Sequence, residues 1–169
     1  MKGLLFILLL LPVFVKGQVR DVMAKYPIDA PSMDNLNDGI LGRWKFEEDT
    51  NKNNFYEIIR RKPYALDKYH IKFWDRGGTN PSYEANMHFS KIGNALFINV
   101  PYFEGNFSHS GFFFLKVVEM SADVSKITAV VVKDKSLWQL NEAEVKQSIM
   151  NNMKKPSYYR DTVHLYKLK

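Results

Sequence analysis

The chain has 169 residues, of which 46% are hydrophobic and 14% aromatic, and it contains no cysteine. Such a composition is typical of a globular domain with its own core and excludes a disordered chain. The lack of cysteine excludes a disulfide framework, a thiol nucleophile and a cysteine-based zinc site. The formal charge is +6, but the basic residues are scattered and do not alternate with aromatics, so we expect no nucleic-acid partner.

Residues 1–17 have the layout of a secretory signal peptide. Lys2 gives a positive start, and the apolar run from Leu4 to Val15 has about a dozen residues, too few to span a bilayer comfortably. We therefore expect cleavage before Gln18, a secreted or periplasmic protein, and no stable membrane span after cleavage. An uncleaved N-terminal anchor is the alternative. Removal of Lys2 and Lys16 would leave 22 basic and 18 acidic residues, a net charge of +4.

Residues 18–39 are predicted to form an arm that leads into the main domain, residues 40–169. Pro27 and Pro31 interrupt regular structure there, although the passage allows a short helical turn at residues 22–25. Three strands are then predicted at residues 40–48, 55–62 and 67–75, followed by a Gly/Asn/Pro loop at residues 76–81.

The stretch from Tyr83 to Asp134 predicts a meander of four strands. Its first run alternates apolar and polar residues with a period of two, so one face is buried and the other is exposed. Gly93-Asn94 suits a tight hairpin turn. The runs Phe112–Leu115 and Ile127–Val132 are apolar on both faces, which is expected where a sheet is covered on both sides or encloses a cavity.

A helix is predicted to start at Asn141, where Glu144 completes a capping box, and to end before Pro156. A last strand is predicted at residues 162–169. The sequence therefore predicts an all-β, mainly antiparallel protein with about eight strands and one α-helix before the last strand. A barrel and a sandwich both fit this pattern, and the long apolar runs favour the barrel.

Gly42-Arg43-Trp44 opens the first strand of this predicted barrel, and the Gly-x-Trp resembles the lipocalin signature. The late helix also resembles the lipocalin layout. The passage MHFSKIGNALFINV with the later GFFFLKV is similar to secreted bacterial lipocalin-like proteins of uncharacterised function. The resemblance implies that Trp44 plugs one end of a calycin-type barrel and that Arg160 approximates the basic residue stacked on it. The chain lacks the Thr-Asp-Tyr triplet and the two cysteines of many lipocalins, and an ordinary core Trp after a turn glycine is the alternative interpretation.

The best functional indication is the surplus of large apolar side chains, which could line a small barrel. An eight-stranded barrel is either filled by its side chains or holds one small ligand. The first hypothesis is a small hydrophobic ligand bound inside the barrel or at its mouth. We expect it to contact Trp44, Tyr56, Tyr69, Phe73, Met87, Phe89, Phe112 and Phe114.

The second hypothesis is a filled barrel that contacts an envelope or extracellular protein partner. Its contacts would come from the loops at residues 76–81 and 102–111, with Trp74, Tyr102, Phe103 and Phe107 as anchors. The two hypotheses differ in whether the barrel interior is open.

Metal and catalytic sites have little support. His70 and His88 fall on the polar faces of neighbouring strands, where Glu84 is the nearest third ligand, but two histidines facing solvent explain the same pattern. The sequence contains no G-x-S-x-G elbow, P-loop or dinucleotide-binding glycine pattern. We therefore predict no enzymatic activity, no cofactor and no metal.

Overall fold

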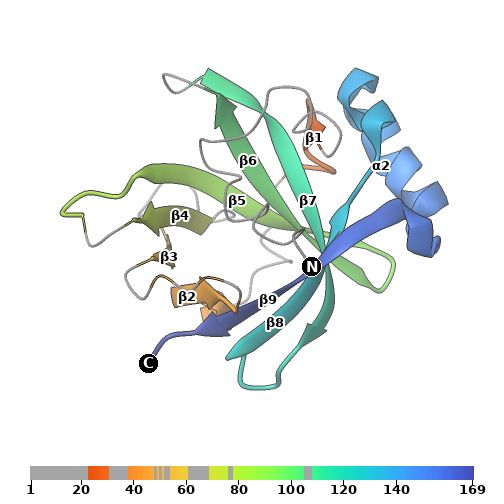
Figure 1. The fold of residues 1–169 in the computed structure, drawn as a ribbon. Coiled ribbons are helices and arrows are strands. Elements are labelled where there is room, and N and C mark those ends of the chain that lie inside the picture. Colours follow the sequence, from red (N-terminus) through yellow and green to blue (C-terminus); the bar gives the residue numbers. More distant parts are fainter. Residues whose placement is uncertain are drawn as a thin grey trace.

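A computed structural model describes residues 23–30, 38–47, 49, 51, 54–60, 69–75, 78–104 and 108–169, with only the backbone described at residues 102–104 and 108–110. The predicted signal peptide, residues 1–17, lies outside these ranges. The described strands form one antiparallel sheet in the order β1-β7-β6-β5-β4-β3-β2-β9-β8, and a further β7–β8 pairing closes it. The predicted all-β fold is confirmed as a closed eight-stranded barrel of β2–β9 (Figure 1).

The strands of the barrel match the predicted runs closely. They are β2 (Gly42–Phe46), β3 (Phe55–Arg60), β4 (Tyr69–Trp74), β5 (Tyr83–Ile92), β6 (Ala95–Glu104), β7 (Ser108–Met120), β8 (Lys126–Val132) and β9 (Tyr159–Lys167).

The N-terminal segment, residues 23–30, first extends the sheet beside β7 and then passes over the outer face of β5 and β6. Met23 and Ala24 form β1 (Met23–Ala24), which pairs with Phe113 and Phe112 of β7. The helical turn considered for residues 22–25 is therefore wrong at the described positions. Ile28 follows and is buried with the residues beneath the helix.

The β5–β6 turn is the predicted Gly93-Asn94 hairpin. Ile92 pairs with Ala95 across it, and Gly93 has a φ of 58°. A positive φ at the first of two turn residues is the type II′ arrangement, which glycine adopts without steric cost. The turn fixes the register in which β5 and β6 alternate between the interior and the outside of the barrel.

The helix α2 (Glu142–Asn152) covers part of the outer surface (Figure 1). The predicted capping box is present, since the Glu144 amide donates to Asn141 Oδ1 at 3.1 Å and the Asn141 amide donates to Glu144 Oε2 at 2.8 Å. Val145 and Ile149 are fully buried against the outer faces of β6 and β7. Within the described ranges, no helix combines the length and apolar character needed to cross a membrane.

Short 3-10 helices explain where the strand boundaries differ from the prediction. The turn η3 (Asp38–Ile40) delays the start of β2, and η5 (Pro156–Tyr158) leads directly into β9, which begins three residues earlier than predicted. β6 continues to Glu104 and β7 begins at Ser108. Most of the loop predicted at residues 102–111 is therefore strand, with an irregular register between Tyr102 and Phe103.

Candidate ligand cavity

The barrel contains an apolar cavity of about 110 Å³ that is partly open to its surroundings. Sixteen described residues from all eight barrel strands and the turn before β2 line it, and none of them is charged. The interior is therefore not completely filled. The lining residues are Ile40, Trp44, Phe46, Tyr56, Ile58, Ile71, Tyr83, Met87, Ile98, Val100, Pro101, Phe113, Leu115, Ile127, Val163 and Leu165.

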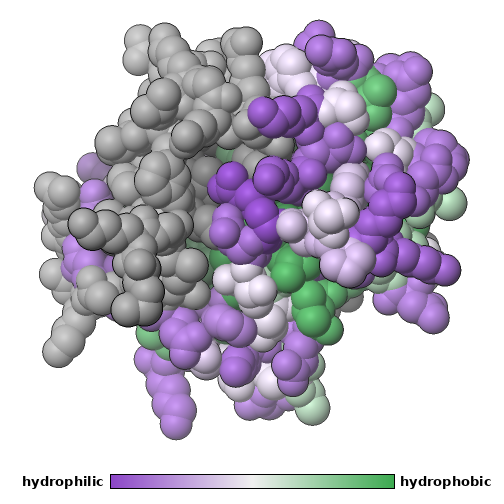
Figure 2. Space-filling view, turned by 45° about the vertical axis from the view of Figure 1, so that its right-hand side comes forward, coloured by the Kyte–Doolittle hydropathy of each residue, from purple (hydrophilic) through white to green (hydrophobic). Residues whose placement is uncertain are grey.

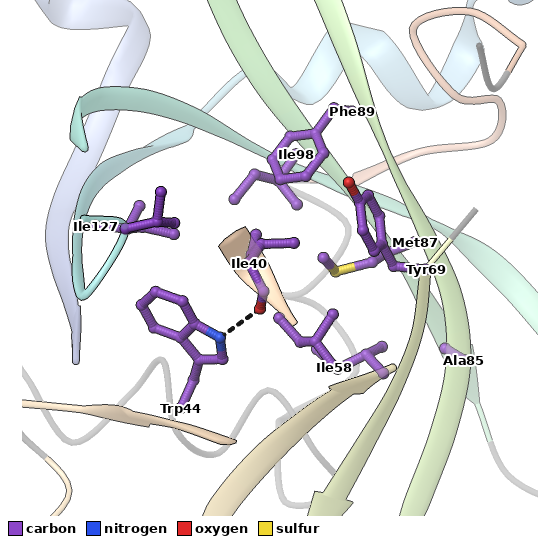
Figure 3. Close-up of a cluster of buried hydrophobic side chains, with 11 residues drawn as sticks. Ile40, Trp44, Ile58, Tyr69, Ala85, Met87, Phe89, Ile98 and Ile127 are labelled. Carbon is purple, nitrogen blue, oxygen red and sulfur yellow. Dashed lines mark hydrogen bonds between the residues drawn. The ribbon is translucent and has the colours of Figure 1, made fainter. Parts of the chain in front are cut away.

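Trp44 forms part of the cavity wall and is fully buried. Its indole N–H donates a hydrogen bond of 2.7 Å to the carbonyl of Ile40, which satisfies the only polar atom of the side chain (Figure 3). Ile58, Met87 and Ile127 lie around the same space. A buried indole with its N–H satisfied contributes a large, rigid apolar surface to the wall.

Gly42 and Lys167 hold this end of the barrel together. Gly42 has a φ of +123°, and a Cβ there would lie 3.0 Å from the Cε of Lys167. Lys167 pairs with Trp44 between β9 and β2. Its Nζ lies 5.8 Å from the centre of the indole ring and donates to the carbonyl of Gly39 at 2.7 Å. The backbone at Gly42 therefore leaves the space in which Lys167 reaches across the Trp.

The sequence reasoning assigned this basic position to Arg160, and that assignment is wrong. The Nε of Arg160 lies 2.9 Å from the carboxylate of Asp161, while the cation over the Trp44 ring comes from Lys167 at the end of the same strand. The β2–β9 register places Lys167 opposite Trp44, and a register between strands at the two ends of the chain cannot be read from either strand alone.

Aromatic rings on β2 and β3 form part of the cavity wall, and a ring on β4 packs against them. The ring of Tyr56 lies edge-on to Phe46 at 5.3 Å between centroids and tilted against Phe73 at 4.9 Å. Both contacts are in the range of favourable aromatic pairs. The ring of Tyr56 is thereby fixed from two sides while its exposed part contributes to the cavity lining.

Only three polar side-chain atoms belong to the lining residues. The indole N–H of Trp44 is bonded to Ile40, and the hydroxyl of Tyr83 donates to the carbonyl of Pro101. The Tyr56 hydroxyl has no hydrogen-bond partner in the described part of the chain. Burial, then the nearby Asp49 carboxylate and Tyr83, raise the pKa of Tyr56, so its hydroxyl is neutral at physiological pH.

The eight predicted contact residues fall into three groups. Trp44, Tyr56 and Met87 line the cavity. Tyr69, Phe73 and Phe89 are buried, with Tyr69 and Phe89 in edge-on contact at 5.5 Å in the same core cluster as Trp44. These three side chains are not among the residues that line the cavity.

Phe112 and Phe114 lie on the opposite face of β7. They pack in the cluster beneath α2, where Phe114 is fully buried with Val145 and Ile149. Phe113 and Leu115 line the cavity in their place. The sequence identified the correct strand but the wrong face of it, because the pattern of a run that is apolar on both faces does not show which face is interior.

His70 and His88 are buried rather than exposed. His70 and His88 are 6% and 4% exposed, so the interpretation that they face solvent is wrong. His70 contacts Glu84 Oε2 at 2.6 Å through Nε2 and Asn86 Oδ1 at 3.1 Å through Nδ1. The predicted proximity of Glu84 is correct, but no three His, Asp or Glu side chains of the described ranges are grouped so as to hold a metal ion.

The second hypothesis, in which loops of a filled barrel contact a protein partner, remains a prediction. Phe107 and the side chains of Tyr102 and Phe103 lie outside what the structure describes, and Trp74 stacks on Phe55 at 5.9 Å. The described part of the face seen in Figure 2 is mainly hydrophilic, with its hydrophobic residues in small groups.

Comparison with protein-family models, curated proteins and solved structures finds no match to this chain. The cavity and its polar groups are therefore the basis for assigning a function.

Proposed function

We propose that this is an exported, lipocalin-like protein that binds a small hydrophobic ligand inside its barrel. The observation that carries the proposal is the apolar cavity of about 110 Å³ within a closed eight-stranded barrel. Support for the lipocalin likeness comes from the Gly42, Trp44 and Lys167 arrangement and from the helix before the last strand.

Packing energetics support an occupant for this cavity. Protein interiors are close-packed, and a void costs about 24 cal/mol per Å³. A fully enclosed void of about 110 Å³ would cost about 2–3 kcal/mol, which is an upper bound for a cavity that is partly open. A small apolar molecule that fills the space restores those contacts, as benzene does in an engineered cavity of about 150 Å³.

The cavity size restricts the ligand. Pockets for drug-sized molecules usually measure about 300–1,000 Å³, so the described space suits a single ring or a short chain. A retinoid or a haem would not fit wholly within this space. This narrows the hydrophobic ligand to a compact one.

Ligand binding is tested on uniformly ¹⁵N-labelled protein, purified without detergent, by following the three tryptophan indole N–H signals during titration with toluene. Trp44 lines the cavity, whereas Trp74 stacks on Phe55 on the outer surface. We expect saturable displacement of the Trp44 signal and a Trp74 signal that does not move. No saturable change with toluene, or with any member of a panel of small apolar compounds, would refute the proposal.

Export is the second part of the proposal, supported by the signal-peptide pattern of residues 1–17. The intact mass of the protein recovered from the periplasm or the medium tests it. We expect a chain that begins at Gln18. A cell-associated product that retains residues 1–17 would contradict cleavage and favour the N-terminal anchor.

A further inference from the structure

The charge distribution of the cavity wall limits what the ligand can be. None of the sixteen described lining residues carries a charge, and none is a histidine or a side-chain amide. The nearby cation Lys167 lies over the indole ring and is hydrogen-bonded to the Gly39 carbonyl. A carboxylate in this cavity would lose its hydration without gaining an ionic partner, which is strongly unfavourable.

Hydrogen-bonding capacity in the cavity is concentrated at one group. The Trp44 indole and the Tyr83 hydroxyl each donate to a backbone carbonyl and therefore have no proton left for a ligand. The Tyr56 hydroxyl has no such partner among the described residues, and contacts with Phe46 and Phe73 hold its ring in place. A preoriented hydroxyl in an apolar wall is what fixes the orientation of a ligand in such a pocket.

The negative charge near Tyr56 also disfavours an anionic ligand. The carboxylate of Asp49 raises the pKa of Tyr56 after the larger effect of burial, so the hydroxyl keeps its proton. A negative charge that disfavours a phenolate at this position also disfavours an anionic ligand beside it. The cavity wall therefore offers a ligand the neutral Tyr56 hydroxyl as a hydrogen-bond donor, and its described residues include no cation that could balance a negative charge.

We infer that the ligand is a compact, uncharged molecule with one oxygen acceptor, such as a ketone, an aldehyde or an ester, and that this oxygen accepts a hydrogen bond from Tyr56. Carboxylates of the same carbon skeleton are excluded. This inference rests on the proposed function and specifies the chemical class that the cavity selects.

Three probes with seven carbon atoms test it: 2-heptanone, heptane and heptanoate, each titrated at pH 7.5 into the purified full chain with the Trp44 indole signal as readout. We expect 2-heptanone to bind about fivefold more tightly than heptane, the effect of one ordinary hydrogen bond. We expect no saturable binding of heptanoate. Heptanoate that binds as tightly as 2-heptanone would overturn the inference while leaving the proposed function intact.

Variants assign the selectivity to one hydroxyl. Tyr56→Phe should bring the affinities for 2-heptanone and heptane to within twofold, while heptane binding itself is retained. Tyr159→Phe is the matched control, because its hydroxyl donates to the Met153 carbonyl at 2.7 Å and the residue is not among those that line the cavity, and it should keep the ketone preference. A preference that survives Tyr56→Phe would refute the assignment, and the ranking of the three probes by the unmodified protein tests the ligand class even if a variant misfolds. Failure of all three probes would instead count against the proposed function.

Discussion

The two faces of the β5–β6 wall bury their side chains in opposite ways. On the inner face, Met87 and Ile98 line a space whose described lining residues carry no charge. On the outer face, beneath the N-terminal segment 23–30, Ser90 and Asn99 are fully buried polar residues. Both faces are removed from solvent, yet one is apolar with unfilled volume and the other is polar and filled.

Hydrogen bonding explains the difference. Asn99 Oδ1 accepts from the Ile28 amide at 2.9 Å, and Asn99 Nδ2 donates to the Ser90 hydroxyl at 2.7 Å. The Ser90 hydroxyl donates to Asp29, whose carbonyl lies 2.9 Å from His88 Nε2. Each of these polar groups has a partner within the protein, whereas the Tyr56 hydroxyl in the cavity has none among the described residues. Satisfied polar burial is typical of a structural contact, and an unused donor beside a void is typical of a binding site.

The largest effect is expected from breaking the outer network. Asn99→Ala removes a fully buried side-chain amide, so the Ile28 amide loses its acceptor and the Ser90 hydroxyl loses the hydrogen bond that it accepts, although it still donates to Asp29. We expect the free energy of unfolding to fall by about 3 kcal/mol, since each orphaned buried group costs about 1–3 kcal/mol. Urea denaturation followed by tryptophan fluorescence measures this loss.

The control for Asn99→Ala is Tyr56→Phe, which removes a hydroxyl with no described partner and should change stability by less than about 0.5 kcal/mol. Equal losses for the two variants would contradict the distinction between the two faces.

The next effect concerns the end of the barrel. Gly42→Ala places a Cβ at 3.0 Å from Lys167 Cε on a backbone with a φ of +123°. We expect a loss of about 2 kcal/mol from backbone strain, within the usual range for non-glycine residues in sparsely populated regions. Thermal unfolding measures it.

Gly93→Ala is the matched control for Gly42→Ala. Its φ is also positive, at +58°, but nothing lies within 4 Å of the added Cβ. It should cost less, because alanine is strained by the positive φ at this position too but its Cβ would meet no neighbouring atom. A Gly93→Ala loss equal to that of Gly42→Ala would show that contact with Lys167 contributes nothing.

The fold was predictable because its signals are local. The Gly93-Asn94 turn and the Asn141 capping box each depend on a few neighbouring residues, and both are confirmed. The alternation of buried and exposed residues in β5 is confirmed only in its first half, because His88 and Ser90 on the predicted exposed face are buried. The parts that failed depend on contacts between distant segments. His88 was assigned to a solvent-facing strand face that the N-terminal segment covers.

The same limit applies to the cavity. Trp44, Tyr56 and Met87 were predictable as lining residues because each is a large apolar side chain on a predicted barrel strand. Phe113 was missed in favour of its two neighbours, because the helix that makes the outer face of β7 apolar comes from a later part of the chain. No pattern within a run that is apolar on both faces distinguishes an interior filled by side chains from one with a void.

Alkaline pH should lower the free energy of unfolding through Tyr56, which lies on the inner wall of the barrel. The pKa of Tyr56 is raised in the folded protein, first by burial and then by Asp49, while an unfolded tyrosine titrates near pH 10. Above pH 10 the unfolded chain releases this proton and the folded chain keeps it, so the unfolded state binds fewer protons and stability falls as pH rises. The stabilisation is fully present below pH 10.

For one such tyrosine the expected fall is about 1 kcal/mol per pH unit above pH 10. Urea denaturation between pH 9 and 11.5 measures it, and the slope should be shallower by that amount in Tyr56→Phe. An identical slope in the variant would show that Tyr56 ionises as readily in the folded state as in the unfolded one. Tyr158 and Tyr159, whose pKa values are also raised by burial, contribute to the slope that remains.

The smallest effect is a gain in stability from filling the void. Val163 is 2% exposed and lines the cavity, so Val163→Ile adds one methylene to empty space and should stabilise the fold by about 0.8 kcal/mol. Val132 is equally buried, but it lies in the packed cluster beneath α2, so Val132→Ile should cost about 1–3 kcal/mol through overpacking. Adding one methylene is thus expected to stabilise the protein on the inner side of the barrel wall and to destabilise it on the outer side. If Val163→Ile also destabilises, the void is not available to a side chain and the case for a ligand there fails; if it stabilises and weakens toluene binding, side chain and ligand compete for one space.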